Sequence, residues 1–404
     1  MGGTVRIVCV GGGPAGLYFS ILMKLWDPAN DVTVFERSKE GATHGWGVTM
    51  EQKFLATLAE LDAESAKEIK SQSVRWHDQV VCFGGEREVN DRNGDTHGVG
   101  RQRFVDLLAH RARRLGVEIH YSREVRDKSE LPDADLIVAA DGVNSRFRTS
   151  PEFGTSIAEG RNKYIWLGTG KVFEAFSFFF EPTEAGWIWA HAYQHDPMTS
   201  TFIVECAPET WTGLGFDTSP VGRTLDRLES IFAAPLAGRR LWTQFSDGTE
   251  AQWLNFRTVS NERWHHGNVV LVGDAAHTAS FSVGLGTTLA MQDVIALASH
   301  LRRAGERAGH GADLAKGSLH EALTGYQKQR QAELRARATE AARSALWFES
   351  VARYTNLTPS QFAAVLHARR APLLPLLPPP LFCYLHALRR QVGVIDKLRS
   401  LADR

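Results

Sequence analysis

The feature that most constrains this chain is an apolar strand that runs straight into a glycine-rich turn and a helix near its amino terminus. The apolar run spans residues 5–10, the turn GGGPAG spans 11–16, and an apolar segment of helical length follows at 17–23. A second apolar run at 31–35 ends in Glu36. Two buried strands joined by one helix predict a parallel pair with a right-handed crossover.

The glycines of this turn match the needs of a phosphate-binding loop. Gly11 permits the tight turn after the strand, Gly13 lets the backbone approach a pyrophosphate, and Gly16 lets the helix pack against the strand. The helix N-terminus offers free N–H groups and a partial positive charge to the phosphates. Glu36, 20 positions after Gly16, is placed to accept hydrogen bonds from ribose hydroxyls. An acid at that position fits FAD or NAD and would repel the 2′-phosphate of NADP.

A second glycine-rich stretch, GDAAHTASFSVGLGTTLAMQDV at 273–294, follows an apolar run at 269–272. Asp274 stands at the carboxyl end of that predicted strand, where open α/β sheets bind ligands. Gly284 and Gly286 are predicted to open the next helix, whose N-terminus can hold a carbonyl, an anion or a developing negative charge. Two such loops on one chain predict a single long dinucleotide held at both ends, which suits FAD better than a nicotinamide cofactor.

Between the two loops the pattern changes from strands alternating with helices to aromatic and β-branched strands. Residues 164–205 alternate in polarity and are broken by Gly, Pro and Asp, which predicts antiparallel strands with one covered face. The predicted fold is α/β: a Rossmann-like FAD-binding domain interrupted by a mixed or antiparallel β-sheet substrate domain, with a helical C-terminal region. The predicted boundaries are 1–72, 98–160 and 260–345 for the FAD-binding domain, 73–97 and 161–259 for the substrate domain, and 346–404 for the C-terminal region.

Composition restricts the partners of the chain. Its 404 residues carry 46 basic and 46 acidic side chains, and this balance argues against bulk attraction to nucleic acid or to an anionic membrane. No run approaches the roughly 20 apolar residues of a spanning helix and no secretory signal is evident, so we expect a cytoplasmic protein without stable membrane insertion. No His, Cys and Asp cluster has metal-ligand spacing, so no metal is predicted. The expected assembly is a monomer or a homodimer.

Three motifs in order carry a likeness to a known family: GGGPAG with Glu36, DGVNSRFR at 141–148, and GDAAH at 273–277. The chain resembles the aromatic-ring hydroxylase family of FAD monooxygenases over roughly residues 4–345. The resemblance implies FAD as cofactor, NADH or NADPH as reductant, and a small aromatic substrate with molecular oxygen as partners. The stretches HAYQHDPMTSTFIVE and HGVGRQRFVDLLAHRARRLGVE are similar to a narrower branch. That branch contains anthraniloyl-CoA and salicylyl-CoA hydroxylases, the tryptophan-oxygenating enzyme of violacein synthesis and the indole hydroxylase of xiamycin-type pathways.

The resemblance also implies roles for particular residues. Asp141 and Gly142 are expected where FAD and the nicotinamide cofactor both pass, and Asp274 near the ribityl and pyrophosphate groups. Arg101 looks like the family's FAD-pyrophosphate arginine, and Ser280 stands where the branch usually has a His that faces the flavin edge. The predicted cofactor-binding residues are Gly11, Gly13, Pro14, Ala15, Gly16, Glu36, Arg37, Arg101, Asp141, Gly142, Asp274, Gly284, Leu285 and Gly286.

The reaction that the resemblance implies is hydroxylation of an electron-rich ring through a flavin C4a-hydroperoxide, after hydride transfer from NADH or NADPH. Gly284, Leu285 and Gly286 are expected to frame the flavin pyrimidine ring. The peptide N–H groups of Gly284 and Gly286 are the predicted catalytic groups there, since they can stabilise negative charge on reduced flavin without a titrating side chain.

The substrate is expected against the middle sheet. Strand alternation puts Trp187, Trp189 and His191 on one face, and Phe178 and Phe180 are further candidates from the preceding run. Trp189 and His191 are the predicted catalytic side chains, with His191 orienting the substrate or accepting a proton. Aromatic residues on a strand are also ordinary core residues, so this assignment stays open.

Neutral charge and an aromatic middle sheet favour an apolar arene such as an indole. The resemblance to the narrower branch implies an indole or indole-terpenoid of secondary metabolism as the expected substrate. Two alternatives stay open. One is an aryl-CoA substrate of the anthraniloyl-CoA or salicylyl-CoA type, which needs a basic entrance. The other is a flavin dehydrogenase or reductase that inserts no oxygen.

Overall fold

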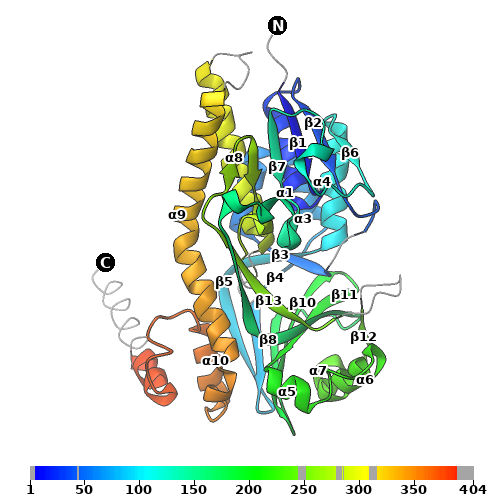
Figure 1. Ribbon diagram of the computed structural model, residues 1–404. Coiled ribbons are helices and arrows are strands. Elements are labelled where there is room, and N and C mark those ends of the chain that lie inside the picture. Colours follow the sequence, from blue (N-terminus) through cyan, green and yellow to red (C-terminus); the bar gives the residue numbers. More distant parts are fainter. Residues whose placement is uncertain are drawn as a thin grey trace, which may run out of the picture.

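The computed structural model describes residues 5–42, 45–243, 252–278, 284, 286–308 and 316–388. Figure 1 shows a helix-flanked sheet above a larger sheet, with the long helix α9 (Lys316–Glu349) running beside both. The upper region is of the parallel α/β type and the lower region is built mainly of antiparallel strands. The predicted fold class is therefore confirmed.

The smaller sheet has six strands in the order β14-β15-β7-β1-β2-β6. β1 (Arg6–Val10) pairs in parallel with β2 (Asp31–Phe35) and with β7 (Leu136–Ala139), as the glycine-rich crossover predicts. β1 and β7 are almost wholly buried, which explains their uninterrupted apolar runs. The other elements of this region are β6 (Glu118–His120), β14 (His265–His266), β15 (Val269–Leu271), α1 (Pro14–Trp26), α4 (Arg101–Arg114) and α8 (Gly286–Ala308).

The larger sheet has nine strands in the order β12-β8-β11-β10-β9-β4-β5-β3, and β13 pairs with β8 outside this path. Its pairings are antiparallel except for the parallel pair of β4 with β9, so the sheet is mixed. The strands are β3 (Gly47–Glu51), β4 (Val74–Phe83), β5 (Glu86–Gly100), β8 (Thr155–Thr169), β9 (Phe176–Thr183), β10 (Gly186–Asp196), β11 (Thr199–Cys206), β12 (Leu241–Trp242) and β13 (Leu254–Asn261).

The two faces of the larger sheet bury different cores. Ile188, Ala190 and Phe202 belong to the core that includes Leu228 of α6 (Val221–Ile231). The opposite face packs against the end of α9 and against α10 (Pro359–His367). That second core joins these side chains: Phe178, Phe180, Trp189, Trp347, Phe348 and Phe362. The C-terminal helices therefore cover part of the face that also points toward the smaller sheet.

The remaining helices are short. They are α2 (Gln52–Leu61), α3 (Ala63–Ser71), α5 (Pro208–Gly213) and α7 (Ala233–Leu236), with 3-10 turns at Lys128–Glu130, Gly142–Asn144, Phe147–Thr149, Pro151–Phe153, Gly273–Ala275 and Val351–Tyr354. Within the described ranges, no helix combines the length and the apolar character that a membrane crossing needs. The predicted domain boundaries remain a proposal. β3 lies within the segment 1–72 assigned to the FAD-binding domain, yet it pairs with β5 in the larger sheet.

One buried histidine makes the fold sensitive to acid. His195 of β10 lies between the hydroxyls of Thr199 (3.2 Å) and Thr201 (3.0 Å) and packs beside Gly47 of β3. Burial lowers the pKa of His195 to about 4, although Asp196 opposes the shift. Between pH 6.5 and pH 4 the unfolded chain therefore binds a proton that the folded chain excludes, so stability is lost as the pH falls through this window.

We expect this histidine alone to lower the free energy of unfolding by about 2 kcal/mol between pH 7 and pH 5. Urea unfolding at the two pH values measures the loss, and His195→Gln should remove that part of it. His110→Gln, at an exposed position on α4, is the matched control and should keep the wild-type pH dependence. An unaltered pH dependence in His195→Gln would contradict the prediction.

Candidate active site

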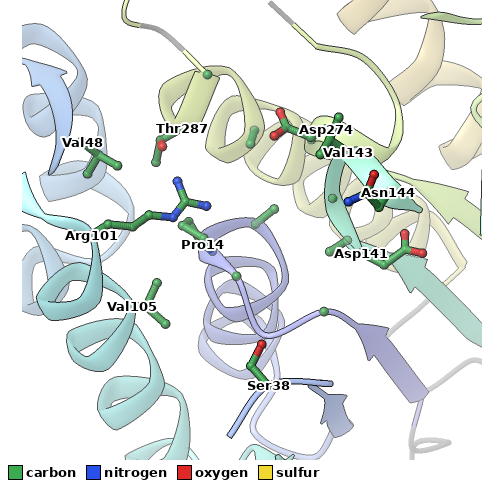
Figure 2. A pocket seen from close by; sticks show the side chains of 18 of the residues that line it. Pro14, Ser38, Val48, Arg101, Val105, Asp141, Val143, Asn144, Asp274 and Thr287 are labelled. Atoms are coloured by element: carbon green, nitrogen blue, oxygen red, sulfur yellow. The ribbon is translucent and has the colours of Figure 1, made fainter. Parts of the chain in front are cut away.

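A cavity of about 800 Å³ lies where the two sheets meet. The carboxyl ends of β1, β2, β7 and β15 supply one side of its lining, and β8, β9, β10 and β13 supply the other. Figure 2 shows side chains from both loops converging there, with Asp141, Asp274 and Pro14 around one opening. The topology explains this convergence, because the carboxyl ends of parallel strands meet at one edge of a sheet.

The first glycine loop has the backbone geometry of a dinucleotide-binding turn. Gly11 has φ of +112°, and a Cβ there would lie 2.3 Å from the carbonyl oxygen of Ala140. A Cβ on Gly16 would lie 2.0 Å from the carbonyl oxygen of Gly11, so only glycine lets α1 pack this close. Gly13 differs, because a Cβ there would meet no atom within 4 Å and the residue lines the cavity. The glycines at 11 and 16 thus serve the fold, and Gly13 leaves room for a ligand.

This contrast predicts opposite effects for two alanine variants. Gly13→Ala should leave the apo-protein as stable as wild type or up to about 1 kcal/mol more stable, since its φ of −77° suits alanine. The added methyl should raise the Kd for FAD about tenfold in a fluorescence titration. Gly16→Ala should instead lower the free energy of unfolding by at least about 2 kcal/mol. An unchanged FAD affinity in Gly13→Ala would contradict the assignment.

Glu36 closes the loop at the end of β2. One carboxylate oxygen accepts a hydrogen bond from the Gly12 N–H at 2.7 Å and the other from the Ser38 N–H at 2.7 Å. Glu36 and Arg37 both line the cavity, together with Pro14 and Ala15 at the start of α1. The carboxylate is therefore fixed by backbone donors while facing the space in which a ribose would lie.

Arg101 places a guanidinium group in the wall of the cavity. It begins α4 and extends toward Pro14 and toward Thr287 of α8 (Figure 2). Its Nε atom is buried and makes no hydrogen bond within the described part of the chain. Burial lowers the pKa of Arg101, although the nearby Asp274 opposes the shift. A buried guanidinium N–H without an acceptor, beside a helix N-terminus, fits a pyrophosphate.

Arg148, which the sequence analysis missed, joins the turn at Asp141 and Gly142 to the turn at Gly273 and Asp274. One Nη atom of Arg148 donates to the carbonyl oxygens of Gly142 and Asp274, each at 3.1 Å. Asp141 accepts the N–H of Arg146 at 2.7 Å, and its other carboxylate oxygen is buried without a partner in the described residues. Such an oxygen suits a ribose or ribityl hydroxyl donor. The motif DGVNSRFR could have pointed to Arg148, because the sequence analysis gave roles to Asp141 and Gly142 and none to the arginines of the motif.

Asp274 contributes a carboxylate to the wall of the cavity. The Asp274 side chain is exposed to the cavity, but the surrounding protein removes it from bulk water. This desolvation raises the pKa of Asp274, and the nearby Arg101 and His277 act in the opposite direction. Gly284 and Gly286 line the same wall, and α8 begins at Gly286 as predicted. The Gly284 carbonyl accepts the hydroxyl of Thr49 at 3.0 Å. The predicted residues Ser280 and Leu285 lie outside the described residues.

Beneath the GDAAH turn lies a largely buried polar network around Asp293 and Arg330, two residues to which the sequence analysis gave no role. Asp293 of α8 accepts hydrogen bonds from His277 Nε2 at 2.8 Å, the Gly273 N–H at 3.0 Å and Arg330 Nε at 2.7 Å. Burial by itself would raise the pKa of Asp293, but His277 and Arg330 outweigh it and lower that pKa. The sequence signal for Asp293 was an acidic residue within the apolar run that follows Gly286. This network ties the cofactor-side turn to α9.

An aromatic wall from the larger sheet faces the glycine loops. Trp166 of β8, Phe176 of β9 and Tyr193 of β10 line the cavity. The rings of Phe176 and Tyr193 stack with centroids 5.4 Å apart, and the Tyr193 hydroxyl donates to the Gly47 carbonyl at 2.8 Å. The wall is thus rigid and largely apolar, which suits a flat aromatic ligand.

The predicted strand alternation is confirmed, but the predicted substrate residues are divided between two places. His191 lines the cavity and is 2% exposed. Trp189, Phe178 and Phe180 lie instead in the core shared with Phe348, because the C-terminal helices cover that part of the sheet. The indole N–H of Trp189 donates to Glu205 at 3.1 Å, so its link to the cavity is indirect.

Comparison with known proteins agrees with this geometry. The FAD binding domain family matches residues 4–314. The chain belongs to the FAD-binding aromatic hydroxylase family. This hydroxylase is 36% identical over 380 residues to salicyloyl-CoA 5-hydroxylase of a Streptomyces species, covering 91% of this chain and 70% of that protein. It is 30% identical over 379 residues to protodeoxyviolaceinate monooxygenase of Chromobacterium violaceum, covering 92% and 96%.

The fold of the hydroxylase is similar to that of 2-methyl-3-hydroxypyridine-5-carboxylic acid oxygenase in its tetrameric form. The TM-score is 0.66 at 20% identity, over 95% of this chain and 96% of that one. The hydroxylase is an FAD-dependent aromatic monooxygenase, and NADH or NADPH is the typical reductant of its class. In the part of the chain that the structure describes, no three His, Cys, Asp or Glu side chains are grouped to hold a metal ion.

Proposed function

We propose that this hydroxylase inserts one oxygen atom from O2 into an electron-rich indole or indole-terpenoid ring of a secondary-metabolic pathway. The observation that carries the proposal is the cavity in which an aromatic wall, formed by Trp166, Phe176 and Tyr193, faces the glycine-rich loops. An uncharged ring gains free energy from burial against such a wall, and its polar group sets its orientation.

The residues of the protein are proposed to bind FAD, to orient the substrate and to shield the reacting atoms from water. Gly13 and Arg101 would hold the pyrophosphate of FAD, while Asp141 and Asp274 would accept hydrogen bonds from its hydroxyls. When bound, FAD would supply the redox chemistry, in which electrons from NADH or NADPH activate O2. The peptide N–H groups at Gly284 and Gly286 are proposed to stabilise negative charge on its ring. The aromatic wall is proposed to limit the access of water to the reacting atoms.

A second candidate substrate is an aryl-CoA thioester. The 36% identity to a salicyloyl-CoA 5-hydroxylase over most of this chain favours it. Arg257 of β13 lines the cavity on the side of the larger sheet and is half-exposed, and it pairs with Glu159 at 3.3 Å, so this side of the cavity offers a cation near its surface. The thioester would need further cations at the entrance for its phosphates.

The test compares three ligands with the FAD-loaded enzyme: indole, an indolyl terpenoid and salicyloyl-CoA. Each is scored by the shift of visible flavin absorbance, by stimulation of NADH or NADPH consumption, and by mass spectrometry of the product under ¹⁸O₂. We expect one ligand class to give all three signals with one labelled oxygen per product. Product that forms without oxygen would instead indicate a flavin dehydrogenase and contradict the proposal.

A further inference from the structure

A second cavity, of about 430 Å³, lies between one face of α9 and the segment around β14. Among the described residues, none lines both this cavity and the one proposed to hold FAD. Its volume is in the range of small-molecule sites. We propose that this second cavity binds a small anion through the phosphate groups of that anion, at a site separate from that of FAD.

The lining of the second cavity is basic. Asp and Glu are absent from its described lining, whereas the whole chain has 46 Asp and Glu and 46 Lys and Arg. The local excess of basic groups therefore comes from the fold and not from the composition. A hollow lined by charges of one sign raises the local concentration of counter-ions. The basic lining residues are Arg263, His265, His266, His320, Lys328 and Arg335.

Two segments of the chain assemble this lining. On α9 the lining positions are 320, 324, 327, 328, 331 and 335, and their spacing puts them on one face of the helix. The opposite wall comes from residues 263 and 265–267, which include β14 and lie beside its pairing with β15. The Thr324 hydroxyl lies 3.3 Å from His265 Nε2, so the two walls touch at residues 59 positions apart.

Further contacts hold the two walls in place. Gln327 Oε1 accepts the backbone N–H of Trp264 at 2.9 Å. The side chain of Trp264 is buried in the core of the smaller sheet and anchors this wall. The rings of His265 and His320 meet edge to face, with centroids 5.4 Å apart. Because the walls are already held by the fold, a ligand that binds between them orders few additional groups.

Three permanent cations of this lining have no partner within the described part of the chain. The side chains of Arg263, Lys328 and Arg335 make no hydrogen bond and no ion pair there. The exposed arginines of α4 differ, since Arg113 and Arg114 both pair with glutamates from other segments. The N–H groups of the three cations are therefore available to the oxygen atoms of a bound anion.

The neighbouring groups leave the positive charge of this cavity uncompensated. Burial lowers the pKa of His265, and the nearby His320 and His266 act in the same direction. Glu152, an exposed acid that does not line the cavity, interacts electrostatically with His266 and Arg263. Within the described residues it forms no ion pair with either of them. An anion in the cavity would therefore relieve a repulsion that the protein itself leaves in place.

The chemistry of the lining favours a phosphate group over a metal ion. In the described ranges of the chain, no three His, Cys, Asp or Glu side chains are grouped to hold a metal ion. The guanidinium and ammonium groups of this cavity would also repel a metal ion. A phosphate group offers several acceptor oxygens and up to two negative charges, so it can bind several of these donors together. Inorganic polyphosphate and a phosphorylated metabolite both carry this chemistry.

Isothermal titration calorimetry of the FAD-saturated enzyme at low ionic strength tests the site while FAD fills its own cavity. Pyrophosphate represents the inorganic source, adenosine 3′,5′-bisphosphate represents a phosphorylated metabolite, and succinate is a dianion without phosphate. We expect pyrophosphate or adenosine 3′,5′-bisphosphate to bind with a Kd below about 1 mM, and the one that binds more tightly identifies the source. Succinate should bind at least about tenfold more weakly, since it offers fewer acceptor oxygens in the geometry that a guanidinium prefers.

A charge-matched pair of double variants locates the binding. Lys328→Gln with Arg335→Gln removes two exposed cations that line the cavity, and it should raise the Kd at least about tenfold. Arg303→Gln with Arg337→Gln removes two exposed cations of α8 and α9 that do not line it, and it should change the Kd less than about threefold. Arg263→Gln removes a cation from the opposite wall and should raise the Kd about fivefold, so the site is tested even if the α9 variant folds poorly.

Three results would overturn the proposal, and none of them bears on the proposed oxygenation. One is the absence of binding by pyrophosphate and adenosine 3′,5′-bisphosphate up to about 10 mM. Another is an equal effect, or no effect, of the two double variants, because the binding would then report net charge or another location. The third is an affinity for succinate equal to that for both phosphate compounds, which would show a site for any dianion.

Discussion

Arg330→Met is expected to lower the free energy of unfolding by about 3–5 kcal/mol, because it leaves the carboxylate of Asp293 buried without the guanidinium that pairs with it. Arg330 and Asp293 are 3% and 0% exposed, and their N–O distance is 2.7 Å. Urea or thermal unfolding of the purified protein measures the change. The loss should also weaken FAD retention, since Asp293 holds the N–H of Gly273 beneath the cofactor-side turn.

Two further variants distinguish the contribution of the buried Arg330–Asp293 pair from that of the more exposed Arg330–Glu333 pair. Arg330 also pairs with Glu333, which is 47% exposed, and Glu333→Gln should cost less than about 1 kcal/mol. The double variant Arg330→Met with Asp293→Asn should be more stable than Arg330→Met alone, because the uncompensated charge is gone. A loss below about 1 kcal/mol in Arg330→Met would show that the network contributes little.

Arg101→Met is expected to raise the Kd for FAD about 100-fold, because it removes a desolvated cation from the proposed pyrophosphate site. The apo-protein should be as stable as wild type, since the buried Nε of Arg101 has no acceptor within the described residues. Titration of FAD into the apo-protein, followed by flavin fluorescence, measures the affinity. Chemical unfolding of the same apo-protein measures the stability.

Arg103→Met provides the matched control for this prediction. Arg103 lies two positions further along α4, is exposed, and donates its Nε to Gln72 at 3.3 Å. Its removal should change the FAD Kd less than about threefold, because its charge does not face the cavity. An Arg101→Met protein that binds FAD within fivefold of wild type would place the pyrophosphate elsewhere.

Much of the fold could be predicted because its signals are local. The apolar runs at β1 and β7 are strands buried on both faces, and alternation in β10 separates Trp189 and His191 from Ile188. Covering of the sheet by the C-terminal helices was not predicted. It depends on aromatic side chains of α9 and α10 meeting a strand more than 150 positions earlier, and no short-range pattern encodes such a meeting.

The glycine-rich loops of the site were also predictable, since glycines constrain the backbone within a few residues of themselves. Local patterns in the chain were enough to predict the two loops, their order and the edge of the sheet at which they meet. No local pattern shows which side chains face the cavity or which polar groups are buried together, because both depend on the packing of the folded protein. Asp293 and Arg330 are 37 positions apart, and Asn162 and Glu205 are 43 apart. Their contacts exist because whole helices and strands pack in one arrangement, and that packing energy is summed over the entire molecule.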